Sequence, residues 1–72
     1  MRVEFRLPAL MGERRLKIND VARGTGLRYS TVYHLYHGRA TMVSFEAIAK
    51  LCAFLGCEPG DLLKLVRDGE GE

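Results

Sequence analysis

The stretch INDVARGTGLRYSTVYHLYHG, residues 18–38, decides the fold of this 72-residue chain. Apolar residues recur at helical spacing on both sides of Gly26, which predicts one helix over 18–25 and a second over 29–37. Glycine readily adopts the left-handed conformation in which many helices end, so Gly26 predicts a tight turn between the two helices. Such a pair is a helix-turn-helix, whose second helix can enter a DNA major groove.

The second helix of the pair has a polar face of unusual composition. At 100° per residue, Val32, Leu35 and Tyr36 fall on the inward side. The outward side holds Ser30, Tyr33, His34 and His37, with Tyr29 on the boundary. This outward side has hydroxyls and imidazoles and no carboxylate, so it can hydrogen-bond to base edges and phosphates without repelling them. It indicates a DNA-reading surface, and the alternative is a polar helix face without a ligand.

The flanking segments predict three more helices and one strand. Pro8 suits the first turn of a helix over 7–15, and Ser44 suits the N-cap of a helix over 44–55. The expected inward stripe of that fourth helix is Phe45, Ile48, Ala49, Cys52 and Leu55. Pro59 predicts the start of a short fifth helix over 59–65.

The two ends of the chain are expected to differ from the helical middle. Residues 2–6 alternate charged and apolar, which predicts a strand. Residues 68–72 are polar and acidic and are expected to fray. We therefore expect one domain over 1–72, all-α with five helices, with a candidate strand pair at its ends.

Charge is unevenly distributed along the chain. The formal net charge is +2, but residues 1–50 hold nine Lys/Arg against four Asp/Glu, and residues 51–72 hold two against five. Within 14–43 there are six basic residues and one acidic residue, Asp20. This asymmetry indicates a polyanion-binding face on one side of the molecule.

Other classes of protein find little support in the composition. No apolar run is long enough to span a membrane, and the charged N-terminal segment predicts no secretory signal, so a cytoplasmic location is expected. Cys52 and Cys57 are interpreted as small apolar residues rather than as a disulfide or metal ligands. We find no nucleophile–base pattern, and expect no enzyme activity, cofactor, metal or small-molecule ligand.

Residues 16–63, LKINDVARGTGLRYSTVYHLYHGRATMVSFEAIAKLCAFLGCEPGDLL, resemble the helix-turn-helix domain of phage repressor and Cro proteins and of small bacterial regulators related to them. The resemblance implies a five-helix fold with residues 29–37 as the recognition helix. It implies base contacts by Tyr29, Ser30 and His34, with Thr31 and Tyr33 flanking them. It implies phosphate contacts by Lys17, His37, Arg39 and Thr41, to which Arg28 is added as the cation preceding the helix. Some relatives pair their terminal strands, and 64–67 is the candidate partner for 2–6.

Three positions depart from the pattern of this family. Many relatives have a phosphate-binding glutamine where this chain has Ile18. Many have an arginine–glutamate ion pair where Met11 and Tyr36 stand, and an apolar contact can replace such a pair without loss of stability. Gly24 inside the second helix is expected to destabilise it by about 0.8–1 kcal/mol.

Two functions remain as hypotheses at this point. The first is a sequence-specific regulator of transcription, repressor-like, that binds double-stranded DNA as a homodimer, because two copies can occupy half-sites about 34 Å apart. The second is a protein-interaction module that keeps the fold without reading DNA, which Ile18 and the aromatic face favour.

Overall fold

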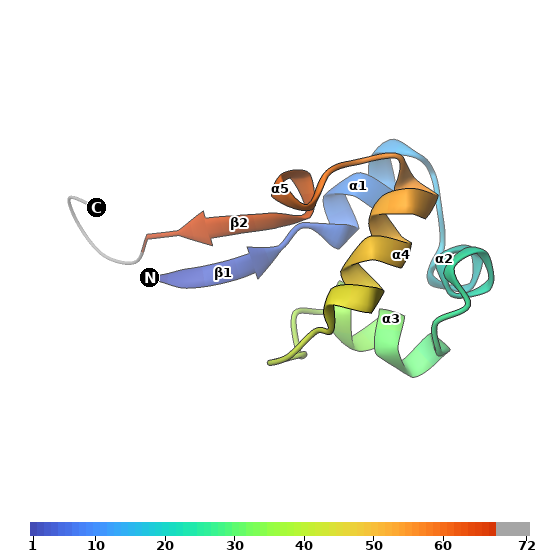
Figure 1. Cartoon of the computed structure of the whole chain (residues 1–72), viewed down its shortest axis with the longest axis horizontal. Helices are drawn as coiled ribbons and strands as arrows, with labels where there is room; N and C mark the ends of the chain where they lie inside the picture. Colours follow the sequence, from blue (N-terminus) through green and yellow to red (C-terminus); the bar gives the residue numbers. More distant parts are fainter. Residues whose placement is uncertain (68–72) are drawn as a thin grey trace.

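The computed structural model describes residues 1–67, so the expected frayed tail at 68–72 lies outside the described residues. Its helices are α1 (Leu7–Glu13), α2 (Ile18–Thr25), α3 (Tyr29–Tyr36), α4 (Phe45–Leu55) and α5 (Pro59–Leu62), and its strands are β1 (Arg2–Phe5) and β2 (Leu63–Val66). The helices form a bundle from which the two strands project as a ribbon (Figure 1). The described part measures 41 × 22 × 19 Å, and the ribbon lies along its long direction.

The strand pair corrects the all-α expectation. β1 and β2 are antiparallel, with Arg2 opposite Val66 and Phe5 opposite Leu63. The pairing of the terminal strands is thereby confirmed, although β2 begins one residue earlier than expected. As a result α5 is a single turn that ends at Leu62, and the expected helix over 59–65 is wrong. Leu63 is already extended because it pairs with Phe5.

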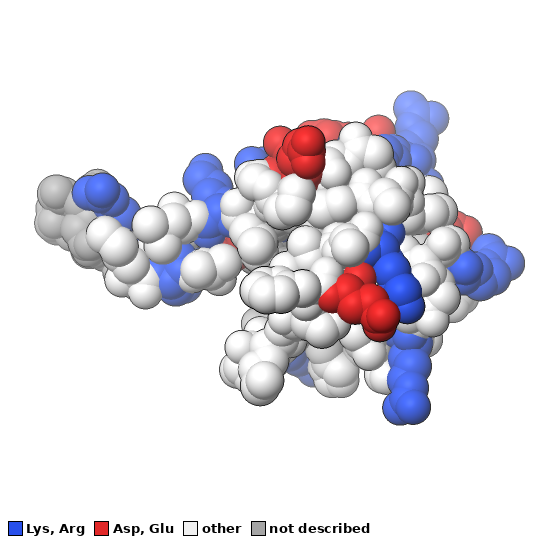
Figure 2. All heavy atoms as spheres, viewed as in Figure 1, with Lys and Arg blue, Asp and Glu red and all other residues white. Residues whose placement is uncertain are grey.

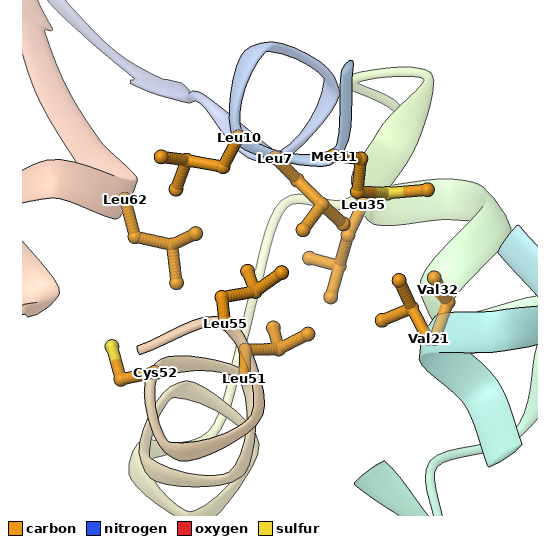
Figure 3. Close-up of a cluster of buried hydrophobic side chains, with 10 residues drawn as sticks. All are labelled: Leu7, Leu10, Met11, Val21, Val32, Leu35, Leu51, Cys52, Leu55 and Leu62. Atoms are coloured by element: carbon orange, nitrogen blue, oxygen red, sulfur yellow. The ribbon is translucent and has the colours of Figure 1, made fainter. Parts of the chain in front are cut away.

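The core lies between all five helices and is entirely apolar among the described residues (Figure 3). Its members are Leu7, Leu10, Met11, Val21, Val32, Leu35, Leu51, Cys52, Leu55 and Leu62. Every helix contributes at least one of them, so each helix is fixed by the burial of its own apolar stripe. α3 contributes Val32 and Leu35, as its periodicity predicts, and Tyr36 packs against the cluster.

The buried face of α4 differs from the expected stripe. Phe45 is 90% exposed and Ala49 is exposed, whereas Ala47 and Leu51 are buried. Ser44 caps the helix by accepting a hydrogen bond from the backbone N–H of Ala47 at 3.0 Å. Val43 before the cap and Ile48 after it are both half-buried against the core, in the arrangement of a hydrophobic staple. That staple sets the entry angle of the chain and leaves Phe45 outside.

α1 ends at Glu13, two residues before the expected end, because Arg15 adopts a left-handed conformation with φ 54°. The guanidinium of Arg14 then donates to the backbone oxygen of Leu55 at 2.8 Å and to that of Leu10 at 3.0 Å. Arg14 therefore ties the end of α1 to the C-terminus of α4, where a cation is favoured by the helix dipole.

Gly24, expected only to weaken α2, has a packing role. A Cβ atom built on it would overlap the ring of Phe54, whose Cζ atom would lie 2.6 Å away. The ring of Phe54 from α4 therefore rests directly on the backbone of α2. Phe54 remains 38% exposed, so its ring is divided between this contact with α2 and the surface.

Candidate nucleic-acid interface

The turn between α2 and α3 orients the second helix. Gly26 has φ 76°, and its N–H donates to the backbone oxygen of Ala22 at 2.9 Å. The hydroxyl of Thr25 donates to the backbone oxygen of Val21 and accepts from the N–H of Leu27 at 3.2 Å, so the turn is bonded on both sides. Leu27 packs against the core, and Arg28 is extended as the N-cap of α3. The chain thus leaves α2 and re-enters a helix within three residues.

α3 is anchored inward by Val32 and Leu35, which are 0% and 3% exposed. Of the predicted base-contacting residues, Tyr29, Ser30 and His34 are exposed, whereas Thr31 and Tyr33 are half-buried. No Asp or Glu occurs between Tyr29 and Thr41. The outward face is therefore free of carboxylates over the whole length of α3, as the residue pattern predicts.

Aromatic rings along α3 contact one another one turn apart. The rings of Tyr29 and Tyr33 are stacked with centroids 6.2 Å apart, and those of Tyr33 and His37 are 4.4 Å apart. The ring of His34 meets that of Tyr33 edge-on at 5.7 Å. These contacts explain why Tyr33 is half-buried on an outward face. They also restrict the rotamers of the polar tips, which would reduce the entropy lost on binding a ligand.

A groove of about 530 Å³ separates α3 from the segment that follows it. It brings together four predicted site residues: Thr31, His34, Arg39 and Thr41. The groove forms because the chain reverses at Gly38, with φ 68°, and the N–H of Arg39 donates to the backbone oxygen of His34 at 2.9 Å.

The predicted phosphate-contacting residues Arg28, Lys17 and His37 lie outside this groove. Arg28 is exposed at the start of α3, and Lys17 is exposed on a different element, as the N-cap of α2. His37 lines a second groove of about 560 Å³, together with Tyr36 and residues of β1 and α1.

Two of the basic side chains in the stretch 14–43 have partners within the molecule. Arg14 is bonded to α4, and Arg23 pairs with Asp20 at 3.0 Å, so neither is a free cation of the expected polyanion-binding face. In Figure 2, Lys and Arg atoms project from the side of the molecule that carries α2 and from the ribbon, and acidic atoms lie near α5 and also over the start of α4. The acidic atoms near α5 agree with Glu58 and Asp61, which lie just before and within that helix.

Asp20 is the single acidic residue of the basic stretch, and it has a structural role. Its carboxylate accepts a hydrogen bond from the backbone N–H of Lys17 at 2.9 Å, which closes the first turn of α2. This backbone hydrogen bond, followed by the contact with Arg23, lowers the pKa of the Asp20 carboxyl below 3.8. The carboxylate is thereby directed toward the helix start, and Lys17 keeps its side chain exposed.

Sequence reasoning missed two apolar side chains beside the site. Met42 lines the groove next to α3 and is 87% exposed, and Phe45 follows it at the start of α4 with 90% exposure. Phe45 was expected in the core. The signal that identifies it is the staple around Ser44, because a residue directly after the cap cannot join Val43 and Ile48 on the inner side.

The comparison with known proteins agrees with this geometry. Residues 6–68 match the model of the Cro/C1-type HTH DNA-binding domain, which is most of the chain. The chain belongs to this family. It is similar to the uncharacterized HTH-type transcriptional regulator YozG of Bacillus subtilis (strain 168), with 21% identity over 68 residues, which cover 94% of this chain and 81% of the relative. No solved structure matches the chain significantly.

Two of the positions that depart from the family pattern, the first residue of α2 and the Met11–Tyr36 pair, are filled here by side chains that pack against the core. Ile18 is half-buried and packs against the core, so the first position of α2 serves stability here. Met11 is a core residue, and Tyr36 packs against the core, so apolar side chains fill both positions where relatives have an ion pair.

Neither metal nor membrane chemistry is indicated by the described residues. Cys52 and Cys57 are free thiols, and burial is the main reason that the pKa of the Cys52 thiol is raised. Within residues 1–67, no group of three or more His, Cys, Asp or Glu side chains is placed to hold a metal ion. None of the helices in that range is long and apolar enough to cross a membrane.

Proposed function

We propose that this protein is a sequence-specific regulator of transcription, of the repressor type, that inserts α3 into the major groove of double-stranded DNA. The observation that carries the proposal is the exposed, carboxylate-free face of α3, held outward by Val32 and Leu35. Membership in a DNA-binding family supports it, and the name of the relative from Bacillus subtilis supports a role in transcription.

Base selection is assigned to the exposed polar groups of α3. Tyr29, Ser30 and His34 stand at its start and one turn further, with Thr31 and Tyr33 beside them. Hydroxyl and imidazole groups can both donate and accept, so they can read the donor and acceptor pattern of a base pair in the major groove. The ring of Tyr33 contacts the rings of Tyr29 and His34, which restricts the orientations of these two side chains.

Phosphate binding is assigned to residues on either side of that face. Lys17, Arg28 and Arg39 supply positive charge, and His37 and Thr41 supply hydrogen-bond donors. Because these groups contact the backbone of DNA rather than its bases, they contribute affinity and orientation but no direct selection.

Salt dependence tests the phosphate assignment. Three cations that each neutralise one phosphate predict that log K falls with log salt at a slope of about −3 per bound chain. The change Lys17→Ala should reduce that slope by about one unit and weaken binding to all sequences alike. Lys50→Ala is the matched control, because Lys50 pairs with Glu46 on α4 at 3.7 Å, and it should leave the slope unchanged. Binding that does not respond to salt would contradict the proposal.

We further propose that the protein acts as a homodimer on two half-sites. A single α3 contacts few base pairs, and a two-fold pair of chains matches half-sites about one helical turn apart. Enrichment of bound fragments from random DNA should then return an inverted repeat. Recovery of a single unrepeated half-site would contradict the dimer and leave DNA binding intact.

A second candidate function is protein interaction through the same region. Met42 and Phe45 are 87% and 90% exposed beside the groove, and large apolar side chains exposed in proximity often mark partner surfaces. Under this function, Met42→Ser with Phe45→Ser would abolish capture of a protein partner, and DNA would not shift even at low salt. A salt-dependent DNA shift retained by the double variant would favour the first function.

A further inference from the structure

The ribbon of β1 and β2 has one apolar side that its own chain covers only at the base. The pairs Val3–Leu65 and Phe5–Leu63 share this side, because side chains alternate along a strand. Phe5 and Leu63 are half-buried, and the segment 40–43 lies beside them. Val3 and Leu65, further out, are 64% and 57% exposed. An isolated two-stranded ribbon is only marginally stable in water, so this one is a candidate for further pairing.

The hydrogen-bond pattern shows which backbone groups of β1 point outward. The N–H of Arg6 donates to the backbone oxygen of Leu62 at 2.7 Å, and the register continues from there with Glu4 opposite Lys64. In an antiparallel pair the bonded positions alternate, so the even-numbered residues of β1 bond to β2. The N–H and C=O of Val3 and Phe5 therefore point away from β2, and no other strand among residues 1–67 pairs with that edge.

We propose that this outer edge of β1 is a homodimer interface, at which β1 pairs antiparallel with β1 of a second copy about a two-fold axis at Val3. This proposal rests on the homodimer proposed above and names its contact surface. In this register Val3 lies opposite Val3 of the second copy and exchanges both backbone hydrogen bonds with it. The result is a continuous four-stranded sheet with Val3 and Leu65 of both copies on one side.

Charge complementarity selects this register and this edge. With Val3 at the centre, Arg2 lies opposite Glu4 of the second copy, and the symmetry repeats the pair. Met1 lies opposite Phe5, which places an apolar thioether next to a ring. Self-pairing of β2 would instead bring together segments that contain Lys64 and Arg67 and no carboxylate between residues 63 and 67. Opposite charges across a strand pair stabilise it, and like charges destabilise it.

The molecule leaves room for a strand at this edge. The groove of about 560 Å³ that includes His37 runs beside β1 and is bounded by Pro8 and Ala9 of α1 and by the end of α3. No residue of β2 lines it, so the groove lies on the β1 side of the ribbon. In the proposed register, the N-terminus of the second copy lies next to Phe5 and extends toward this groove.

Charge reversal combined with sedimentation equilibrium of the full chain, without DNA, tests the interface. Arg2→Glu and Glu4→Arg each place like charges opposite one another twice, so each should raise the dimer dissociation constant by about tenfold or more. The double variant Arg2→Glu/Glu4→Arg restores opposite charges between the two copies but keeps the like-charge contact of Glu4→Arg with Lys64 within the ribbon, so it should dimerise more tightly than Glu4→Arg alone. Arg67→Glu, at the residue that follows β2, is the matched control and should leave dimerisation unchanged. Circular dichroism confirms that each variant is folded.

The outcomes separate this interface from its alternatives. A wild-type chain that stays monomeric at millimolar concentration would overturn the proposal, as would a double variant that dimerises no more tightly than Glu4→Arg alone. Loss of dimerisation in Arg67→Glu alone would assign the interface to β2 instead. Val3→Pro removes an outward N–H without breaking a bond to β2, so it should also weaken the dimer. Because DNA is absent from every measurement, failure here leaves the proposed DNA binding untouched.

Discussion

Replacement of Gly24 by alanine should destabilise this protein, although the same change favours helix formation in general. In an open helix position, alanine in place of glycine stabilises by about 1 kcal/mol. At Gly24 the new methyl group would overlap the ring of Phe54, which is 38% exposed and thus roughly two-thirds buried. Either the ring stays and the contact is overpacked, at a cost of about 1–3 kcal/mol, or the ring swings out and loses about 1–2 kcal/mol of burial.

Once the gain of about 1 kcal/mol from alanine is subtracted, the first route gives a net loss of about 0–2 kcal/mol in the free energy of unfolding and the second a loss of about 0–1 kcal/mol, so we expect a loss near 1 kcal/mol for Gly24→Ala. Urea denaturation followed by circular dichroism measures it, and the melting temperature should fall by roughly 4–8 °C. Gly12→Ala is the matched control, since a Cβ on Gly12 of α1 would meet nothing within 4 Å. That variant should be stabilised by about 0.5–1 kcal/mol.

A double-mutant cycle isolates the contact itself. In a Phe54→Ala background the ring is gone, so Gly24→Ala should change sign and stabilise the protein by about 1 kcal/mol. The expected coupling between the two positions is about 2 kcal/mol. If Gly24→Ala stabilises the protein equally in both backgrounds, the ring does not rest on α2 and the reasoning is refuted.

Three further changes probe separate parts of the molecule. Arg14→Ala should lower the free energy of unfolding by about 1–2 kcal/mol in urea titrations, because two backbone oxygens lose a charged donor, and should leave the salt dependence of DNA binding unchanged. Asp20 has a lowered pKa when folded, so its contribution to stability is complete well above the ordinary pKa of an aspartate and is lost as the pH falls through the lowered pKa of the folded state. The melting temperatures of wild type and Asp20→Ala should therefore differ at pH 7 and converge toward pH 2; a difference that persists at pH 2 would contradict this. His34→Ala should cost about 1–3 kcal/mol on the preferred site and relax selection at one or two base pairs, whereas an equal loss on all sequences would make His34 a phosphate contact.

Local patterns were sufficient for the helix-turn-helix unit. The bounds of α2 agree with the expected 18–25, and the inward residues of α3 are those that the 3.6-residue period predicts. Both results depend on residues that are close in sequence. Gly26 adopts the positive φ that ends α2, and Val32 and Leu35, one turn apart, are buried together by the hydrophobic effect. The composition of the outward face of α3 was equally readable, because it depends only on which residues the same period turns outward.

Contacts between distant segments decided the rest. Phe45 and Ala49 fit the periodic stripe of α4 as well as Ala47 and Leu51 do, and the packing of Ile48, Leu51 and Leu55 against a core that the other helices build sets the observed face. The end of α5 at Leu62 depends on a strand at the other end of the chain.

By itself, the amino-acid sequence determined α3, the turn before it and its carboxylate-free outward face, because each depends on residues within a few turns of one another. Only the tertiary structure decided that Arg14 is engaged within the molecule, since its guanidinium donates to the backbone oxygen of Leu55, far from it in the sequence. It also decided that the ring of Phe54 packs against the backbone at Gly24, and that one edge of β1 pairs with no other strand among residues 1–67. Those features arise when segments far apart in the chain meet, and their energies depend on the geometry of that meeting.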